Sequence, residues 1–140
     1  HRWAGEVRVR PIRFTLECQK DIVLDSYPGT LGQIITTFAQ NALHHAFAEG
    51  QPGRLTLSAR ALAEDQVELV FADDGKGISS EDLPHVFEPF FTTRRAEGMV
   101  GLGLHIVFNQ VHARLGGRIE VSSAPGAGTR FTLVIPRSAP

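Results

Sequence analysis

Two acidic residues stand among glycines near the middle of the chain, in the run Asp73-Asp74-Gly75-Lys76-Gly77-Ile78. An ionised carboxylate only accepts hydrogen bonds, so a partly buried Asp73 would pair with the amino group of adenine and repel the carbonyl of guanine. Gly75 and Gly77 lack Cβ atoms, which lets the backbone approach a flat base, and Ile78 would supply an apolar wall. The same letters also describe an ordinary turn, so this run indicates an adenine site only together with other motifs.

A second glycine-rich segment, Gly101-Leu102-Gly103-Leu104, comes directly before a predicted helix. The free backbone N–H groups and the dipole of a helix N-terminus attract phosphate oxygens, and glycines allow phosphates to approach. Apolar residues at helical spacing predict the helix over residues 104–115, and Gly116-Gly117 would end it. A Gly-x-Gly pair is otherwise a common flexible connector, so the segment indicates a phosphate site because a packed helix follows it.

An asparagine on a third segment is the candidate metal ligand. Residues 30–48 are predicted to form a helix, because apolar side chains recur along one face and the start has capping-box spacing. Asn41 lies at the margin of that face, four residues after Thr37 and four before His45. Its amide oxygen is a hard donor suited to a Mg²⁺ ion that bridges the phosphates of ATP. A helical asparagine is also commonly just a polar surface residue.

These motifs, in chain order, resemble the N, G1, F and G2 boxes of sensor histidine kinases: Asn41-Ala42, residues 73–78, Phe87-Glu88-Pro89-Phe90-Phe91-Thr92-Thr93 and residues 101–104. A terminal glycine-rich box, Gly126-Ala127-Gly128-Thr129-Arg130-Phe131, extends the resemblance over nearly the whole chain. The chain is thus similar to the catalytic and ATP-binding (HATPase_c) domain of a bacterial sensor histidine kinase, in the GHKL superfamily. The resemblance implies an α/β fold, a two-layer sandwich in which helices cover one face of a mixed sheet. Its 140 residues are expected to form one domain.

The resemblance implies ATP and Mg²⁺ as cofactors and a mobile lid over residues 92–101. Arg94 is the preferred phosphate contact in the lid, because its planar fork bridges two oxygens, although an arginine in a polar loop is also commonly solvated. Phe87, Phe90 and Phe91 would anchor the base of the lid or simply pack in the core. We predict Asn41, His44 and Arg94 as catalytic residues and Asn41 as the metal ligand. The predicted ATP-binding residues are Asn41, His44, His45, Asp73, Gly75, Gly77, Ile78, Thr92, Thr93, Arg94, Gly101, Leu102, Gly103, Leu104 and Thr129.

Four positions depart from the family pattern. Thr37 stands where these kinases commonly have Asn and where hydrolysing relatives carry Glu, so no general base is available to activate water. His44 stands where Lys or Arg is frequent, and a histidine is only partly cationic at neutral pH; it also fits an ordinary surface position. Val100 and His105 remove two hydroxyl groups from the lid motif. These departures favour phosphotransfer over hydrolysis and leave nucleotide affinity open.

The expected function is binding of MgATP and transfer of its γ-phosphate to a histidine on a separate dimerisation domain, in two-component signal transduction. The alternatives are an ATP-hydrolysing GHKL ATPase and a noncatalytic nucleotide-sensing module. In the family, the phosphoacceptor histidine lies on a helix pair before the catalytic domain, and we expect that region to be absent here and the domain to be inactive alone. The implied partners are that upstream domain and a response regulator, in a homodimeric full-length protein.

Composition narrows the remaining classes. A net charge of −1 disfavours a strongly electrostatic surface for nucleic acid or membrane. Cys18 is the single cysteine, which excludes an intramolecular disulfide and suits a reducing compartment. No apolar run approaches the about 18 residues that span a bilayer, so a cytoplasmic domain is expected, while parents of this kind are often anchored in the inner membrane.

The sheet that must position these motifs is predicted from alternating apolar and β-branched residues. Residues 125–128 read as a hairpin turn between the last two strands. The predicted strands cover residues 8–19, 54–61, 67–71, 118–121 and 130–135.

Overall fold

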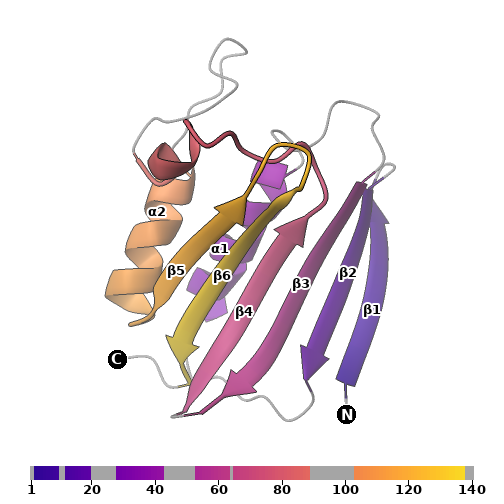
Figure 1. Ribbon diagram of the computed structural model, residues 1–140. Helices are drawn as coiled ribbons and strands as arrows, with labels where there is room; N and C mark the ends of the chain where they lie inside the picture. The colour runs from indigo at the N-terminus through magenta and orange to yellow at the C-terminus, as the bar shows by residue number, and fades with distance from the viewer. Residues whose placement is uncertain are drawn as a thin grey trace.

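The structure, a computed structural model, describes residues 2–9, 12–19, 28–42, 53–63, 65–88 and 103–137. A six-stranded sheet forms one layer, in the order β1-β2-β3-β4-β6-β5 (Figure 1). Only β2 and β3 run parallel among the described strands, and every other neighbouring pair is antiparallel, so the sheet is mixed as predicted. The strands are β1 (Arg2–Val9), β2 (Ile12–Gln19), β3 (Gly53–Leu62), β4 (Gln66–Asp73), β5 (Arg118–Ser123) and β6 (Thr129–Pro136).

Helices α1 (Pro28–Asn41) and α2 (Gly103–Asn109) form the second layer on one face of this sheet (Figure 1). Both helices place apolar residues in the same buried cluster as strands β3 to β6, which confirms the two-layer α/β sandwich. A short 3₁₀ helix, η2 (Leu83–His85), lies between β4 and α2 in the sequence. In the described ranges, no helix has the length and apolar character of a membrane span.

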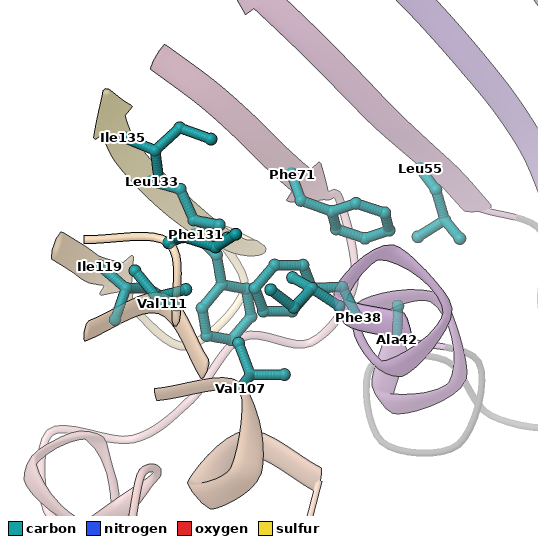
Figure 2. Packing of buried hydrophobic residues seen from close by; sticks show 12 residues of the cluster. Phe38, Ala42, Leu55, Phe71, Val107, Val111, Ile119, Phe131, Leu133 and Ile135 are labelled. Atoms are coloured by element: carbon teal, nitrogen blue, oxygen red, sulfur yellow. The ribbon is translucent and has the colours of Figure 1, made fainter. Parts of the chain in front are cut away.

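An aromatic cluster fixes α1 over the centre of the sheet. Phe71 of β4 and Phe131 of β6 are direct cross-strand partners. Alternate residues of a strand share a face, and both phenylalanines lie on the face that the helices cover. Phe38 of α1 stacks on Phe131 with ring centroids 4.7 Å apart and lies 5.4 Å from Phe71 (Figure 2). All three side chains are buried. This packing sets the height of α1 on the sheet, and therefore the position of Asn41 one helical turn after Phe38.

Helix α2 ends in a widened turn that the sequence did not indicate. Residues Gln110–Arg114 form a π-helical turn, in which Leu115 N–H donates to the Gln110 carbonyl at 3.0 Å. Gly116 has a φ of 69°, and Gly117 N–H donates to the Val111 carbonyl at 3.0 Å. Gly116-Gly117 therefore ends the helix as predicted, by the left-handed turn that glycine adopts without a steric cost.

The predicted strand over residues 8–19 is wrong in its extent, because two antiparallel strands occupy this region. Strand β1 ends at Val9 and β2 begins at Ile12, with Val9 opposite Ile12 in the register. The apolar residues change phase across this boundary, from Val7 and Val9 to Ile12 and Phe14, and Pro11, which cannot donate a ladder hydrogen bond, stands between the two strands in the sequence. Helix α1 begins at Pro28, two residues before the predicted start, and residues 43–48 of that prediction lie outside the described residues.

Candidate active site

Asp73 lies at the end of β4, on the face of the sheet that the helices cover. It follows Phe71 by two residues, and alternate residues of a strand share a face. In the register, Asp73 lies opposite Leu55 of β3 and Thr129 of β6, and Thr129 lies opposite Ser123 of β5. The end of the sheet therefore carries a row of polar side chains beside the apolar core.

The carboxylate of Asp73 is partly buried with few compensating donors. Gly75 N–H donates to its Oδ1 at 2.9 Å, and the backbone N–H of Thr129 also bonds to the carboxylate. Burial raises the pKa of Asp73 above its ordinary value of 3.8, against the lowering effect of these two hydrogen bonds, and the charge of Asp74 adds to the rise. An ionised group in this setting gains from an additional hydrogen-bond donor, which the amino group of adenine would provide.

The adjacent Asp74 is committed to the backbone of a neighbouring strand. Its Oδ1 accepts a hydrogen bond from Arg54 N–H at 2.7 Å, and its own N–H donates to the Arg54 carbonyl at 3.2 Å. These bonds continue the pairing of β3 and β4 beyond the last strand residue. Asp74 is thus hydrogen-bonded to β3 at the end of the strands, and only Asp73 of the pair faces the candidate site.

Two glycines bring the loop after β4 against the hairpin between β5 and β6. A Cβ on Gly77 would collide with the carbonyl oxygen of Ala124, and a Cβ on Gly128 would collide with the carbonyl oxygen of Asp73. Both glycines have a φ of 76°. Gly126 N–H also donates to the Lys76 carbonyl at 2.8 Å. The predicted hairpin turn is confirmed, and its close approach gives Gly77 a structural reason to be glycine that does not depend on a ligand.

Ser123 is a residue of this site that sequence reasoning missed. Its Oγ accepts a hydrogen bond from Ile78 N–H at 2.8 Å, which connects the last residue of the 73–78 run to the end of β5. It also lies 3.0 Å from Oγ1 of Thr129, the cross-strand partner. A signal was present in the sequence, because a tight hairpin over residues 124–128 pairs the residues on either side of it.

Asn41 and the start of α2 lie side by side. A Cβ on Gly103 would lie 3.4 Å from Nδ2 of Asn41 and 2.8 Å from the Cγ2 methyl of Thr37. The Nδ2 of Asn41 donates to the Thr37 carbonyl at 2.9 Å, which leaves the amide oxygen as its donor atom for a metal. The described residues hold no group of three or more His, Cys, Asp or Glu side chains placed for a metal.

Thr37 turns its methyl group toward α2 and its hydroxyl group toward its own helix. The Oγ1 donates to the Gln33 carbonyl at 2.9 Å, while Cγ2 faces the Gly103 backbone. A threonine hydroxyl group is too weakly basic to take a proton from water, so Thr37 is not a general base.

We expect Gly103→Ala to lower the free energy of unfolding by about 1–3 kcal/mol, because the added methyl would press on Thr37 at the contact of α1 and α2. Thr37→Ser removes the opposing methyl and should restore most of this loss in the double variant. Urea denaturation of the parent, both single variants and the double variant measures the coupling. Gly32→Ala on α1 is the control, because a Cβ there meets nothing within 4 Å. Strictly additive effects would contradict the proposed contact.

The described site residues form two groups joined by the aromatic cluster. Phe38 lies one turn before Asn41, and its ring contacts Phe71 and Phe131. Phe71 is two residues from Asp73, and Phe131 is two residues from Thr129. The first group comprises Asp73, Gly75, Gly77, Ile78 and Thr129. The second comprises Asn41, Gly103 and Leu104, of which Leu104 packs against the core. The predicted residues that lie outside the described ranges are His44, His45, Thr92, Thr93, Arg94, Gly101 and Leu102.

Residues 27–139 match the family model described as histidine kinase-, DNA gyrase B-, and HSP90-like ATPase. The chain belongs to this family. It is 37% identical, over 91% of its length, to the sensor histidine kinase ZraS of Klebsiella oxytoca. It is 38% identical, over 74% of its length, to the alginate biosynthesis sensor protein KinB of Pseudomonas aeruginosa. The chain spans 26% and 17% of these two relatives, so each relative is a much longer protein.

Solved structures of the same ATPase family share the fold. The nucleotide-free catalytic domain of histidine kinase ThkA superposes with a TM-score of 0.74 at 26% identity, covering 92% of this chain and 81% of that domain. Full-length ShkA in complex with AMPPNP gives a TM-score of 0.70 at 29% identity, covering 92% of this chain and 26% of ShkA. These comparisons confirm the predicted family and place this chain among the histidine kinase catalytic domains.

Proposed function

We propose that this domain binds MgATP and positions its γ-phosphate for transfer to a histidine of a dimerisation domain, in two-component signalling. The observation that carries the proposal is the convergence of two glycine-bearing loops on the partly buried Asp73 carboxylate. The ZraS relative is named a sensor histidine kinase, and the structure of ShkA contains AMPPNP. A ThkA structure contains the response regulator TrrA, which supports a response regulator as a further partner.

The residues divide the work between the two ends of the nucleotide. Asp73 would accept a hydrogen bond from the adenine amino group, and Ile78 would lie against the base. The amide oxygen of Asn41 would hold Mg²⁺, and the bound ion would neutralise charge on the phosphates. The backbone beside Gly103 would receive phosphate oxygens, because it lies against Asn41. We extend the site to His44 and Arg94 as phosphate contacts.

Transfer needs positioning more than activation. A neutral imidazole nitrogen of the acceptor histidine attacks the γ-phosphorus, the new N–P bond forms, and the bond to the β,γ-bridging oxygen breaks as ADP leaves. Imidazole is already nucleophilic, whereas water requires a base. Thr37 supplies none, because a threonine hydroxyl group is too weakly basic to take a proton from water. We therefore propose phosphotransfer, in a homodimeric parent whose kinase domain is cytoplasmic and which is anchored in the inner membrane, ahead of ATP hydrolysis.

The test joins this chain to a dimerisation domain that carries a phosphoacceptor histidine and follows radioactive γ-phosphate. We expect acid-labile label on protein with little release of free phosphate. Asn41→Ala should reduce labelling at least tenfold and remove the effect of Mg²⁺ on ATP affinity, because the metal loses its protein ligand. Gln40→Ala is the matched control, since Gln40 is the exposed neighbour on the same helix. Rapid, saturable phosphate release would favour the hydrolysing ATPase, and MgATP binding without label would favour the nucleotide-sensing module.

A further inference from the structure

Ser123 joins both loops of the base end of the site through one hydroxyl group. Its Oγ lies 2.8 Å from the Ile78 nitrogen, 2.7 Å from the Gly128 carbonyl oxygen and 3.0 Å from Oγ1 of Thr129. Three contacts equal the full capacity of a hydroxyl group, which has one proton and two lone pairs. Each contact can therefore be assigned a direction.

The chemistry of the three partners fixes the direction of each hydrogen bond. Ile78 N–H can only donate, so Ser123 accepts there. The Gly128 carbonyl can only accept, so it takes the single proton of Ser123. Toward Thr129, Ser123 then has only a lone pair left, and the Thr129 hydroxyl must donate. The proton of Thr129 is thereby held by Ser123, and Oγ1 of Thr129 presents only lone pairs to any other group.

We propose that Ser123 is a positioning residue for purine selection, because it makes Thr129 a hydrogen-bond acceptor beside the Asp73 carboxylate. The inference rests on the proposed function, in which the base end of ATP lies at Asp73. Asp73 and Thr129 are direct cross-strand partners, so their side chains lie on the same face at the end of the sheet. A purine with an amino group at position 6 brings donors to this pair, whereas a 6-carbonyl brings a third acceptor and is rejected.

Because Thr129 is buried, its hydroxyl proton stays hydrogen-bonded to Ser123 and is not exchanged for a hydrogen bond to water. Thr129 is 7% exposed, so bulk water does not readily replace Ser123 as a partner for its proton. A buried acceptor that faces another acceptor loses a hydrogen bond without compensation. Without Ser123, the Thr129 hydroxyl is free to rotate and donate to a 6-carbonyl. Ser123 thus contributes to selectivity without touching the base itself.

Calorimetric titration of the full chain with MgATP and MgITP tests this inference, because ITP carries a carbonyl in place of the 6-amino group. We expect the parent to prefer ATP, and Ser123→Ala to reduce the ATP-to-ITP affinity ratio about fivefold or more. Ser123→Thr keeps a hydroxyl group and should restore the ratio. Ser122→Ala is the matched control, since Ser122 is the exposed neighbour on the opposite face of β5 and should leave the ratio unchanged.

The readout separates selection from a merely structural role. If Ser123→Ala weakens both nucleotides equally or leaves both unaltered, the inference is overturned. If that variant does not fold, Thr129→Val decides instead, because it removes the oriented hydroxyl: a narrowed ratio supports the inference and an unaltered ratio contradicts it. A parent that binds neither nucleotide refutes the proposed function, which is a different result from any of these.

Discussion

Asp73→Asn should lower the affinity for ATP about 100-fold, because it replaces a partly buried, acceptor-only group with an amide that also donates. The adenine amino group would then face a weaker, neutral acceptor, and the loss falls on the base rather than on the phosphates. The fold should survive, since Gly75 N–H can still donate to an amide oxygen at the same position. Calorimetric titration with ATP and GTP, with and without Mg²⁺, measures the change. Unaltered ATP affinity would remove Asp73 from the proposed role.

Asp74→Asn is the matched control for this substitution. Asp74 carries the same chemistry one residue later, but it accepts from Arg54 N–H at the edge of β3. An asparagine can make the same bond through its amide oxygen, so ATP affinity should stay within about threefold of the parent. Equal losses in the two variants would indicate that the general charge of the loop, and not the placement of Asp73, attracts the ligand.

The pH dependence of Asp73→Asn has a defined sign. Burial raises the pKa of Asp73 in the folded state above its pKa in the unfolded state. The contribution of this group to the stability of the ligand-free fold is therefore fully present below the unfolded-state pKa. It is lost as the pH rises through the folded-state pKa. At neutral pH the ionised carboxylate therefore costs stability, and the asparagine variant should unfold at an equal or higher urea concentration than the parent. As the pH falls toward the raised pKa, ATP affinity of the parent should decline while that of the variant stays constant. A clear loss of stability at neutral pH would contradict this account.

Residue patterns sufficed for the sheet and the helix faces. β-Branched and aromatic residues over residues 67–71 and 130–135 identified two central strands, because these residue types pack well on the pleated surface of a sheet. The amphipathic pattern of α1 placed Asn41 correctly relative to Phe38, since the period of a helix is fixed by its geometry. The boundary between β1 and β2 was missed, although the apolar residues change phase between Val9 and Ile12 and Pro11 stands between the strands.

The hydrogen bonds of the site could not be read from the sequence. Ser123 acts through contacts with Ile78 and Thr129, and these depend on a cross-strand register that becomes known only once the hairpin is folded. Likewise, the sequence showed a threonine at position 37 but not that its hydroxyl group bonds to Gln33 while its methyl group faces Gly103. Residue type sets what a side chain can donate or accept, and tertiary structure decides which partner receives it.

Alanine substitutions at the two glycines of the β5–β6 hairpin distinguish the cost of a left-handed backbone conformation from the cost of a steric collision. Gly126 and Gly128 have φ angles of 78° and 76°, so a Cβ at either position meets the same left-handed penalty of about 1–2 kcal/mol. A Cβ on Gly126 meets nothing within 4 Å, whereas one on Gly128 would collide with the carbonyl oxygen of Asp73.

We therefore expect Gly126→Ala to cost only that penalty and Gly128→Ala to cost at least about 2 kcal/mol more in the free energy of unfolding, measured by urea denaturation. Gly128→Ala should also reduce ATP affinity strongly, because the backbone of Asp73 must shift to relieve the collision and carries the carboxylate with it. Gly126→Ala should leave affinity nearly unchanged. Equal stability losses in the two variants would show that the hairpin does not press on β4. The adenine specificity proposed for Asp73 would then need a support other than this contact.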